Sequence, residues 1–189
     1  MDNKALKNIL IKISIKELLL NNWDKLDIKI LSKKSKRSIE EVLSICSSKH
    51  VLLDYWSQKI NVEMVKDISI EELEEVSKKE RVLELMLCRF DALKSRTKEV
   101  NALIKLSKNS LLESSNGFNR VKISMELILS YSGISCKGSM GLIKVKALSI
   151  IWYLTLREWS KGELIDDNAL LAKLNKRLSI AEKLYKIIL

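Results

Sequence analysis

The sequence contains no proline and only five glycines among its 189 residues. These two residue types mark most of the tight turns that join β-strands, so their scarcity argues against hairpins and sheets. Leucine, isoleucine, lysine and glutamate are abundant instead, and most of these residues favour helices. The composition therefore predicts an all-α protein, long enough for one domain or two small ones with a buried core.

Cysteine and histidine are also scarce. Cys46, Cys88 and Cys136 are widely spaced, and His50 is the one histidine, so no group of residues has the spacing of metal ligands. We expect free thiols in a reducing compartment and no metal site. The lone histidine, the lack of an acid-base pair at a glycine elbow and the lack of a phosphate-cradling loop also argue against an enzyme, and no cofactor is expected.

Targeting segments are missing as well. The N-terminal stretch "MDNKALKNIL" lacks the charged, apolar and small-residue pattern of a signal peptide. The longest apolar run, "ALSIIWYLTL" (147–156), is shorter than the roughly 20 residues that a membrane-spanning helix needs. These two absences predict a cytoplasmic protein.

The charge of the chain is strongly positive, with a net charge of +10 and an isoelectric point near 9.4. Such an excess indicates a polyanionic partner, either a nucleic acid or an anionic membrane surface. An AT-rich genome would produce the same lysine and isoleucine bias without selection for binding. The sequence leaves that alternative open.

Apolar residues recur at helical spacing along most of the chain, beginning with Leu6, Ile9, Leu10 and Ile13. Helices are predicted at 3–20, 28–35, 39–45, from Ser47 or Ser48 onward, 70–93 (long or broken), 98–108, 118–131, 142–159 and 168–188. The stretches "SSNG" (114–117) and "SGISCKGSMG" (132–141) are predicted to be loops. Residues 1–57 would form a small basic domain and residues 58–189 a larger helical bundle.

Residues 28–45 have the lengths of a helix-turn-helix, in which two short helices are joined by a tight turn. Asp27 stands directly before the first of these helices, as an N-cap does. Ser38 and Glu41 have the three-residue spacing of a capping box at the start of the second. A small unit able to enter a DNA groove is therefore one hypothesis for the N-terminal domain.

The residues that follow Ser38 resemble the TetR family of transcriptional regulators. In that family the recognition helix continues through an apolar-Tyr pair and then reaches an aromatic residue and a Ser-Lys pair that opens the next helix. Here Val42-Leu43 occupy the first pair, Cys46 takes the aromatic position, and Ser48-Lys49 match directly. "VLLDYW" looks like the usual "ALL" start of the fourth helix, and "WDKLDIKILSKKS" is similar to the family's lead-in.

Two later segments, "RVLELMLCRFDAL" and "GLIKVKALSIIWYLTLREWSKGE", resemble a narrower TetR-like subgroup. That subgroup is related in fold to the lipid-binding accessory proteins of ubiquinone biosynthesis. Arg89-Phe90-Asp91-Ala92-Leu93 and Leu156-Arg157-x-Trp159 correspond to its recurring segments. The resemblance covers most of the chain. It implies a TetR-like fold of about nine helices, with a three-helix helix-turn-helix unit followed by a bundle.

The resemblance implies that the N-terminal unit binds double-stranded DNA. Basic residues around the turn and at the start of the fourth helix would anchor phosphates. Against this, Glu40 and Glu41 would repel phosphates unless one accepts from a cytosine amino group, and the usual Tyr is Leu43 here. Two alternatives are that the basic cluster is simply a solvated face, and that the two glutamates only cap the helix and complement its dipole. The predicted DNA-binding residues are Lys33, Lys34, Lys36, Arg37, Ser38, Ile39, Glu40, Ser44, Lys49 and His50.

For the bundle, the resemblance implies a cavity for an apolar small molecule or lipid, and a homodimer. The predicted pocket residues are Met86, Phe90, Met125, Leu129, Trp152 and Tyr153, although plain core packing would also account for them. The predicted dimer-interface residues are Trp159, Leu171, Leu174 and Leu178. Peripheral contact of the basic, amphipathic last helix with an anionic membrane is an alternative.

Two hypotheses follow. In the first, the chain is a homodimeric TetR-like transcriptional regulator with a ligand-sensitive bundle. In the second, it is a lipid- or isoprenoid-binding accessory protein of ubiquinone biosynthesis with a degenerate helix-turn-helix. Glu40, Glu41 and Leu43 favour the second, whereas the net charge and Ser48-Lys49 favour the first.

Overall fold

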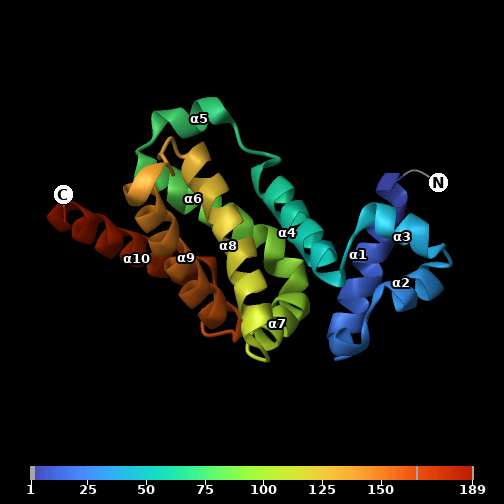
Figure 1. Ribbon diagram of the computed structural model, residues 1–189. Coiled ribbons are helices and arrows are strands. Elements are labelled where there is room, and N and C mark those ends of the chain that lie inside the picture. Colours follow the sequence, from blue (N-terminus) through green and yellow to red (C-terminus); the bar gives the residue numbers. More distant parts are fainter. Residues whose placement is uncertain (1–2, 165, 189) are drawn as a thin grey trace. The chain divides into compact units, whose positions relative to one another are not determined.

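The computed structural model describes residues 3–164 and 166–188, with side chains described as far as Lys183. Every regular element among these residues is helical, which confirms the all-α prediction. The α-helices are α1 (Asn3–Leu19), α2 (Ile28–Ser35), α3 (Ile39–Ile45), α4 (Lys49–Val65), α5 (Ile70–Glu75), α6 (Lys78–Leu93), α7 (Thr97–Leu106), α8 (Leu111–Tyr131), α9 (Gly138–Ser160) and α10 (Asp167–Ile188), with 3-10 turns η1 (Trp23–Lys25) and η2 (Lys94–Arg96) (Figure 1).

The chain folds as two compact units, and each unit is built from two separate chain segments. The first unit contains Met1–Ile60 and Arg96–Asn116, and the second contains Asn61–Ser95 and Gly117–Leu189. Helices α4 and α8 therefore contribute residues to both units. Helix α7, far along the sequence, is part of the unit that holds the helix-turn-helix.

The first unit forms because its helices each turn an apolar face inward. Leu10, Leu31, Val42 and Leu52, on successive helices α1 to α4, are completely buried. Leu106 from α7 joins the same core. Because each fully buried aliphatic side chain is worth about 1.5–3 kcal/mol, this cluster fixes α2 and α3 against α1.

The starts of α8 and α9 differ from the sequence prediction, and the segment 70–93 takes the broken one of its two predicted forms. Helix α8 begins at Leu111, so the "SSNG" stretch is helical rather than a loop. The reason is a cap that the prediction missed, since Ser110 Oγ accepts from the Glu113 amide at 3.1 Å. The long or broken helix predicted over 70–93 is broken, with separate Ser caps at Ser69 and Ser77. Helix α9 begins at Gly138, earlier than predicted.

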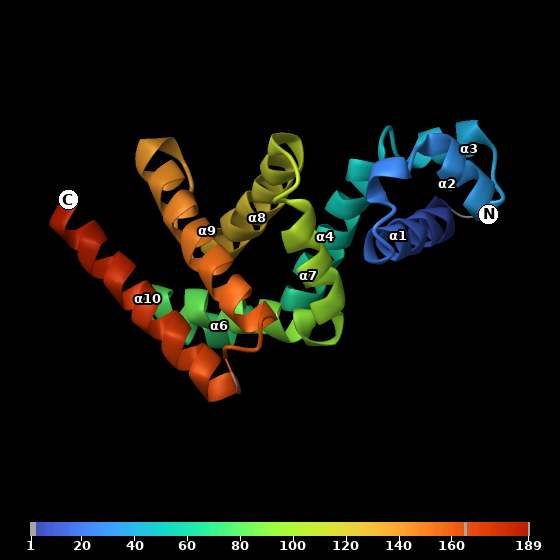
Figure 2. The ribbon, with the colours of Figure 1, turned by 90° about the horizontal axis from the view of Figure 1, so that it is seen from below.

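Helices α6, α9 and α10 pack together in the second unit (Figure 2). Phe90 of α6 is fully buried and contacts the rings of Trp152 and Trp159 of α9, with centroid distances of 4.5 and 5.5 Å. Arg89, also buried, lies over the Trp152 ring at 5.2 Å and donates to the Asn61 side-chain oxygen. Aromatic contacts of this kind contribute beyond the area that they bury.

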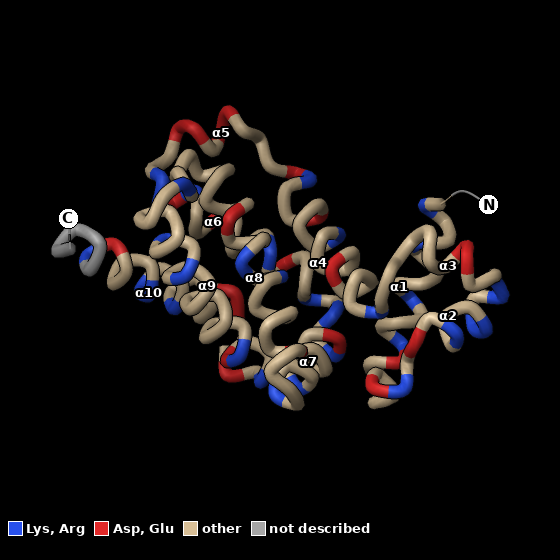
Figure 3. The backbone as a smooth tube through the Cα atoms, in the orientation of Figure 1, with Lys and Arg blue, Asp and Glu red and all other residues tan. Residues whose placement is uncertain are grey.

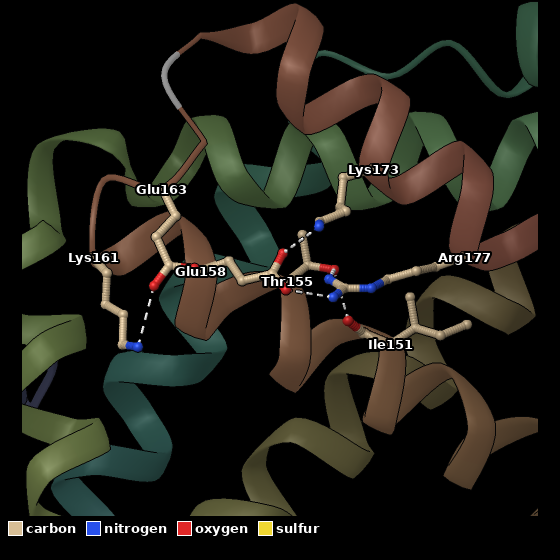
Figure 4. A network of polar contacts seen from close by, with 7 residues as sticks. All are labelled: Ile151, Thr155, Glu158, Lys161, Glu163, Lys173 and Arg177. Carbon is tan, nitrogen blue, oxygen red and sulfur yellow. Dashed lines mark hydrogen bonds and ion pairs between the residues drawn. The ribbon is translucent and has the colours of Figure 1, made fainter.

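A polar network joins α9 to α10 (Figure 4). Arg177 of α10 donates to Glu158 at 2.6 Å and to the Thr155 hydroxyl at 2.7 Å, and Lys173 lies 3.2 Å from the other Glu158 oxygen. The Thr155 hydroxyl in turn donates to the Ile151 carbonyl at 2.8 Å. One half-buried carboxylate therefore holds two cations of the neighbouring helix.

Helix α9 is apolar over much of its surface but not buried all round. By length and composition Gly138–Ser160 could cross a membrane, yet its Val145, Leu148 and Trp152 pack inside the unit. Ile143, Ile150 and Leu154 are 50, 58 and 41% exposed. At spacings of seven and four residues, these three side chains lie on one face of the helix. The chain alone therefore leaves an apolar row on α9 uncovered.

Candidate nucleic-acid interface

Helices α2 and α3 are joined by the three residues Lys36 to Ser38, which is the turn length of a helix-turn-helix. Asp27 caps α2 by accepting from the Ile30 amide at 2.7 Å. Ser38 and Glu41 form a reciprocal capping box at the start of α3, as the sequence predicted. Lys36 takes the left-handed conformation, with φ of 55°, that ends α2. Lysine and arginine follow one another along the end of α2 and the turn (Figure 3).

The solvent-exposed face of helix α3 carries both polar and apolar side chains. Val42 is completely buried and anchors the helix, whereas Ile39, Leu43 and Ser44 are exposed. Glu40 and Glu41 are exposed too, and the Ser44 hydroxyl donates to the Glu41 carbonyl at 2.7 Å. Hydrogen bonds from its own backbone amide and from Ser38 lower the pKa of Glu40, so the exposed face carries a carboxylate at neutral pH.

The basic residues around the turn divide into two groups. Lys33 and Lys36 are exposed, and Arg37 is half-buried with its guanidinium 3.7 Å from Glu41. Lys34 instead lies 2.6 Å from Glu17 of α1, whose side chain is only 6% exposed. That hydrogen bond is the largest of the contributions that lower the pKa of Glu17, against the opposing effect of burial. Lys34 therefore holds α2 to α1.

Lys49 and His50, at the start of α4, contact the interior of the first unit. Lys49 Nζ donates to the Trp23 carbonyl at 2.6 Å and lies over the Trp23 ring at 5.2 Å. His50 Nδ1 is 3.6 Å from Glu113 and 3.3 Å from the Asn116 amide nitrogen. The two side chains that were predicted from the sequence to bind DNA phosphates therefore have partners within the first unit.

Glu113 is the residue in this region that the sequence prediction missed. It is 8% exposed and accepts from the Trp23 indole at 3.0 Å, while its second oxygen lies toward His50. Trp23 and His50 also meet ring edge to ring face at 5.8 Å between centroids. The first turn of α8 is thus fastened to η1 and to α4. The spacing Ser110-x-x-Glu113, typical of a capping box, is the feature of the sequence that could have predicted a helix start here.

The residues predicted for the ligand pocket pack the core of the second unit, apart from one. Met86, Phe90, Met125, Leu129 and Trp152 are buried, whereas Tyr153 is 40% exposed. Of the predicted dimer residues, Leu171 is 40% exposed, Trp159 is half-buried, and Leu174 and Leu178 are buried within the single chain. No three His, Cys, Asp or Glu side chains of the described residues converge as metal ligands.

The sequence and the structure were compared with known proteins. No protein-family model and no curated protein matches the sequence. Among solved structures, a TetR transcriptional regulator from Nitrosomonas europaea ATCC 19718 superposes with a TM-score of 0.65 at 15% identity, covering 94% of this chain and 98% of that chain. A putative TetR-family regulator from Syntrophomonas wolfei str. Goettingen gives 0.65 at 13% identity, covering 94% and 95%.

The chain therefore has the TetR-like fold, as its sequence predicted. Both neighbours are matched over nearly their whole length, so the likeness includes the helix-turn-helix and the bundle alike. At these identities it concerns the fold, and the chemistry of the site has to be argued from this chain's own residues.

Proposed function

We propose that the protein is a TetR-like, DNA-binding transcriptional regulator that acts as a homodimer and takes an apolar ligand in its second unit. The observation that carries this proposal is the doubly capped α2–turn–α3 unit with Lys33 and Lys36 exposed beside an exposed α3. An exposed second helix with lysines at its entry is what major-groove docking and phosphate anchoring require.

Phosphate anchoring would come from Lys33, Lys36 and Arg37. The exposed face of α3 would meet the base edges through Ile39, Glu40 and Ser44. An ionised Glu40 repels phosphate and accepts only from amino groups, so a cytosine amino group is the base-edge partner that it would favour. Specificity in this proposal rests on few contacts.

The dimer would form through the uncovered row on α9, because an exposed apolar stripe on a long helix is buried most simply by its own copy. Two copies would place two helix-turn-helix units on half-sites about one helical turn apart or a multiple of it. A ligand bound in the second unit would then act by changing the distance between the two reading heads.

A lipid- or isoprenoid-binding accessory protein of ubiquinone biosynthesis is the second candidate. The observations that favour it are the acidic face of α3 and the engagement of Lys34, Lys49 and His50 in contacts inside the first unit. In that case the row on α9 would meet a lipid or a membrane surface, and the helix-turn-helix would be a scaffold.

A salt series with random duplex DNA, followed by selection of enriched sequences, separates the two. The regulator is expected to give a steep salt slope and an enriched palindrome. Lys33→Glu with Arg37→Glu is expected to abolish binding. Lys66→Glu with Lys176→Glu makes the same charge change on exposed residues of the second unit and should leave most of the affinity.

Two outcomes would contradict the regulator. Binding without an enriched sequence would mean attraction to phosphate alone. No binding at physiological salt would leave the accessory-protein candidate, and native mass spectrometry of the purified protein would then be expected to detect a co-purified lipid or quinone.

A further inference from the structure

Arg89 of α6 is a buried cation that has no anionic partner among the described residues. It is 5% exposed, whereas arginine is almost never buried so completely unless it is paired. Burial lowers the pKa of its guanidinium to about 9, and no nearby charge contributes to the shift. The guanidinium therefore lies inside the second unit without a carboxylate to balance its charge.

The Arg89 guanidinium uses only part of its hydrogen-bonding capacity. Nη1 donates to the Asn61 side-chain oxygen, and the group lies over the Trp152 ring at 5.2 Å. Nε is buried and donates to no group of the described residues. Nη2 has no acceptor among those residues either. Because Nε and Nη2 project from the same edge of the planar guanidinium, the unused donors form a fork with two parallel N–H groups.

A lone buried charge is costly to the fold. Removal of an ion from water is compensated in proteins by an opposite charge together with further hydrogen bonds. The neutral amide of Asn61 and the face of Trp152 supply only a small part of that compensation. The missing counter-charge therefore points to an anion that is not part of the chain.

The chemistry around Arg89 selects among anions. A carboxylate carries one charge and presents two oxygens in a plane, so it matches one guanidinium and its open fork. A phosphate group carries up to two charges and more oxygens, which would need additional donors. Asn61 is the one polar partner that Arg89 has among the described residues, and Trp152 is aromatic. A carboxylate fits this site better than a phosphate.

An aromatic cluster extends from Arg89 toward the surface of the second unit. Phe90, the next residue of α6, contacts the rings of both Trp152 and Trp159. Trp152 is 1% exposed and Trp159 is half-buried, so the cluster connects the guanidinium with the outside. An apolar group attached to the carboxylate would lie along these rings, as the body of a small-molecule ligand does in most sites.

We propose that Arg89 recognises the acid group of a monocarboxylic acid with an apolar body. The Nε–Nη2 fork binds the carboxylate, and the body lies against Phe90, Trp152 and Trp159, with the Trp159 side chain moving to admit it. This inference rests on the proposed function, because it names the chemical class of the ligand that the second unit takes, but its test involves no DNA.

The test is calorimetric titration of decanoate and of 1-decanol into the full-length protein at about 150 mM ionic strength, where distant charges are screened. We expect saturable binding of decanoate, about tenfold or more tighter than decanol, because hydrogen bonds to a charged group are the strong ones. Arg89→Gln should remove this preference. Arg157→Gln makes the same charge change at an exposed arginine of α9 and should alter decanoate affinity by less than about twofold.

Two further variants separate recognition from a purely structural role. Arg89→Lys keeps the charge without the planar fork, so it should retain part of the preference for decanoate. Arg89→Met with Asn61→Leu replaces both hydrogen-bonding partners by apolar groups of similar size, and should melt at or above the temperature of the parent. This double variant keeps the test valid if Arg89→Gln loses structure, and it should bind decanoate no better than decanol.

The proposal is overturned if decanoate shows no saturable binding, if the parent binds decanoate and decanol equally, or if Arg89→Gln and Arg157→Gln weaken decanoate equally. Displacement of decanoate by an equal concentration of inorganic phosphate would also overturn it, in favour of an inorganic anion.

The failure of the proposed function gives a different result. A protein that binds no DNA but still prefers decanoate through Arg89 would contradict the regulator and leave this site intact. A protein that binds an enriched DNA sequence but does not distinguish decanoate from decanol would contradict this site alone.

Discussion

Lys34 shows how a residue next to the proposed DNA-binding surface can have a structural role. Its ammonium group meets the buried carboxylate of Glu17, and Asn22 donates to the same carboxylate at 3.4 Å. A lysine just before the turn looks like a phosphate contact in the sequence. Its partner lies seventeen residues earlier, and only the fold brings the two together.

We expect Lys34→Ala to lower the free energy of unfolding by about 1–3 kcal/mol, because Glu17 would stay buried without its ion pair. Adding Glu17→Gln should recover much of the loss. Urea denaturation measures both variants. Lys33→Ala, which removes an exposed lysine one residue away, should stay within about 0.5 kcal/mol of the parent, and an equal loss in that control would contradict the assignment.

Cys88 provides a second residue-scale prediction. With its pKa raised to about 11 by burial and then by the nearby carboxylates, the thiol should react slowly with iodoacetamide at pH 8. Glu84→Gln removes one of the charges that raise this pKa, so the alkylation rate of Cys88 at pH 9 should increase. Peptide mapping by mass spectrometry follows this site separately from Cys46 and Cys136. An unchanged rate would mean that burial alone sets the pKa.

At the scale of elements, local signals in the sequence were sufficient for the fold class and for most helix starts. The side chains of Asp27, Ser38 and Ser77 each accept a hydrogen bond from the backbone amide three residues later. A stretch of four residues in the sequence therefore contains both partners of each cap. The contacts of Lys49 and His50 could not be predicted from neighbouring residues in the sequence. Their partners, Trp23 and Glu113, lie on other elements, and charge and position favoured phosphate equally well.

The network between α9 and α10 gives a prediction about pH. Burial raises the pKa of Glu158, but hydrogen bonds from Arg177 and Lys173 outweigh it, so the net pKa is lowered. A carboxyl whose folded pKa is lowered stabilises the fold above its unfolded pKa of about 4.5, and this contribution disappears as pH falls through the folded value.

We therefore expect Glu158→Gln to lower the melting temperature at pH 7, with the difference from the parent shrinking below about pH 4.5. Scanning calorimetry over a pH series measures it. Glu126→Gln removes a partly exposed glutamate of α8 that pairs with Lys122 at 3.6 Å, and should have little effect at any pH. A constant difference down to pH 2 would show that the loss comes from packing and not from charge.

At the scale of the whole molecule, the uncovered row on α9 has a measurable consequence. Ile150→Glu with Leu154→Glu places two charges where the proposed dimer would bury apolar side chains, and sedimentation velocity should show the dimer converted to monomer. Leu111→Glu makes a similar change at a side chain that is 91% exposed on α8 and should leave the dimer intact. A monomeric parent protein would contradict the proposed interface.

The assembly of the first unit from two chain segments limits how this protein could be rebuilt. A chimera that joined residues 1–57 to a foreign bundle would carry α2 and α3 but would lack α7, whose Leu106 belongs to their core, and Glu113, which fastens Trp23. The helix-turn-helix therefore cannot be transferred to another protein as residues 1–57 alone. Exchange of the whole first unit by recombination would need three crossovers, after residues 60, 95 and 116, and grafting the surface of α3 alone is the simpler route.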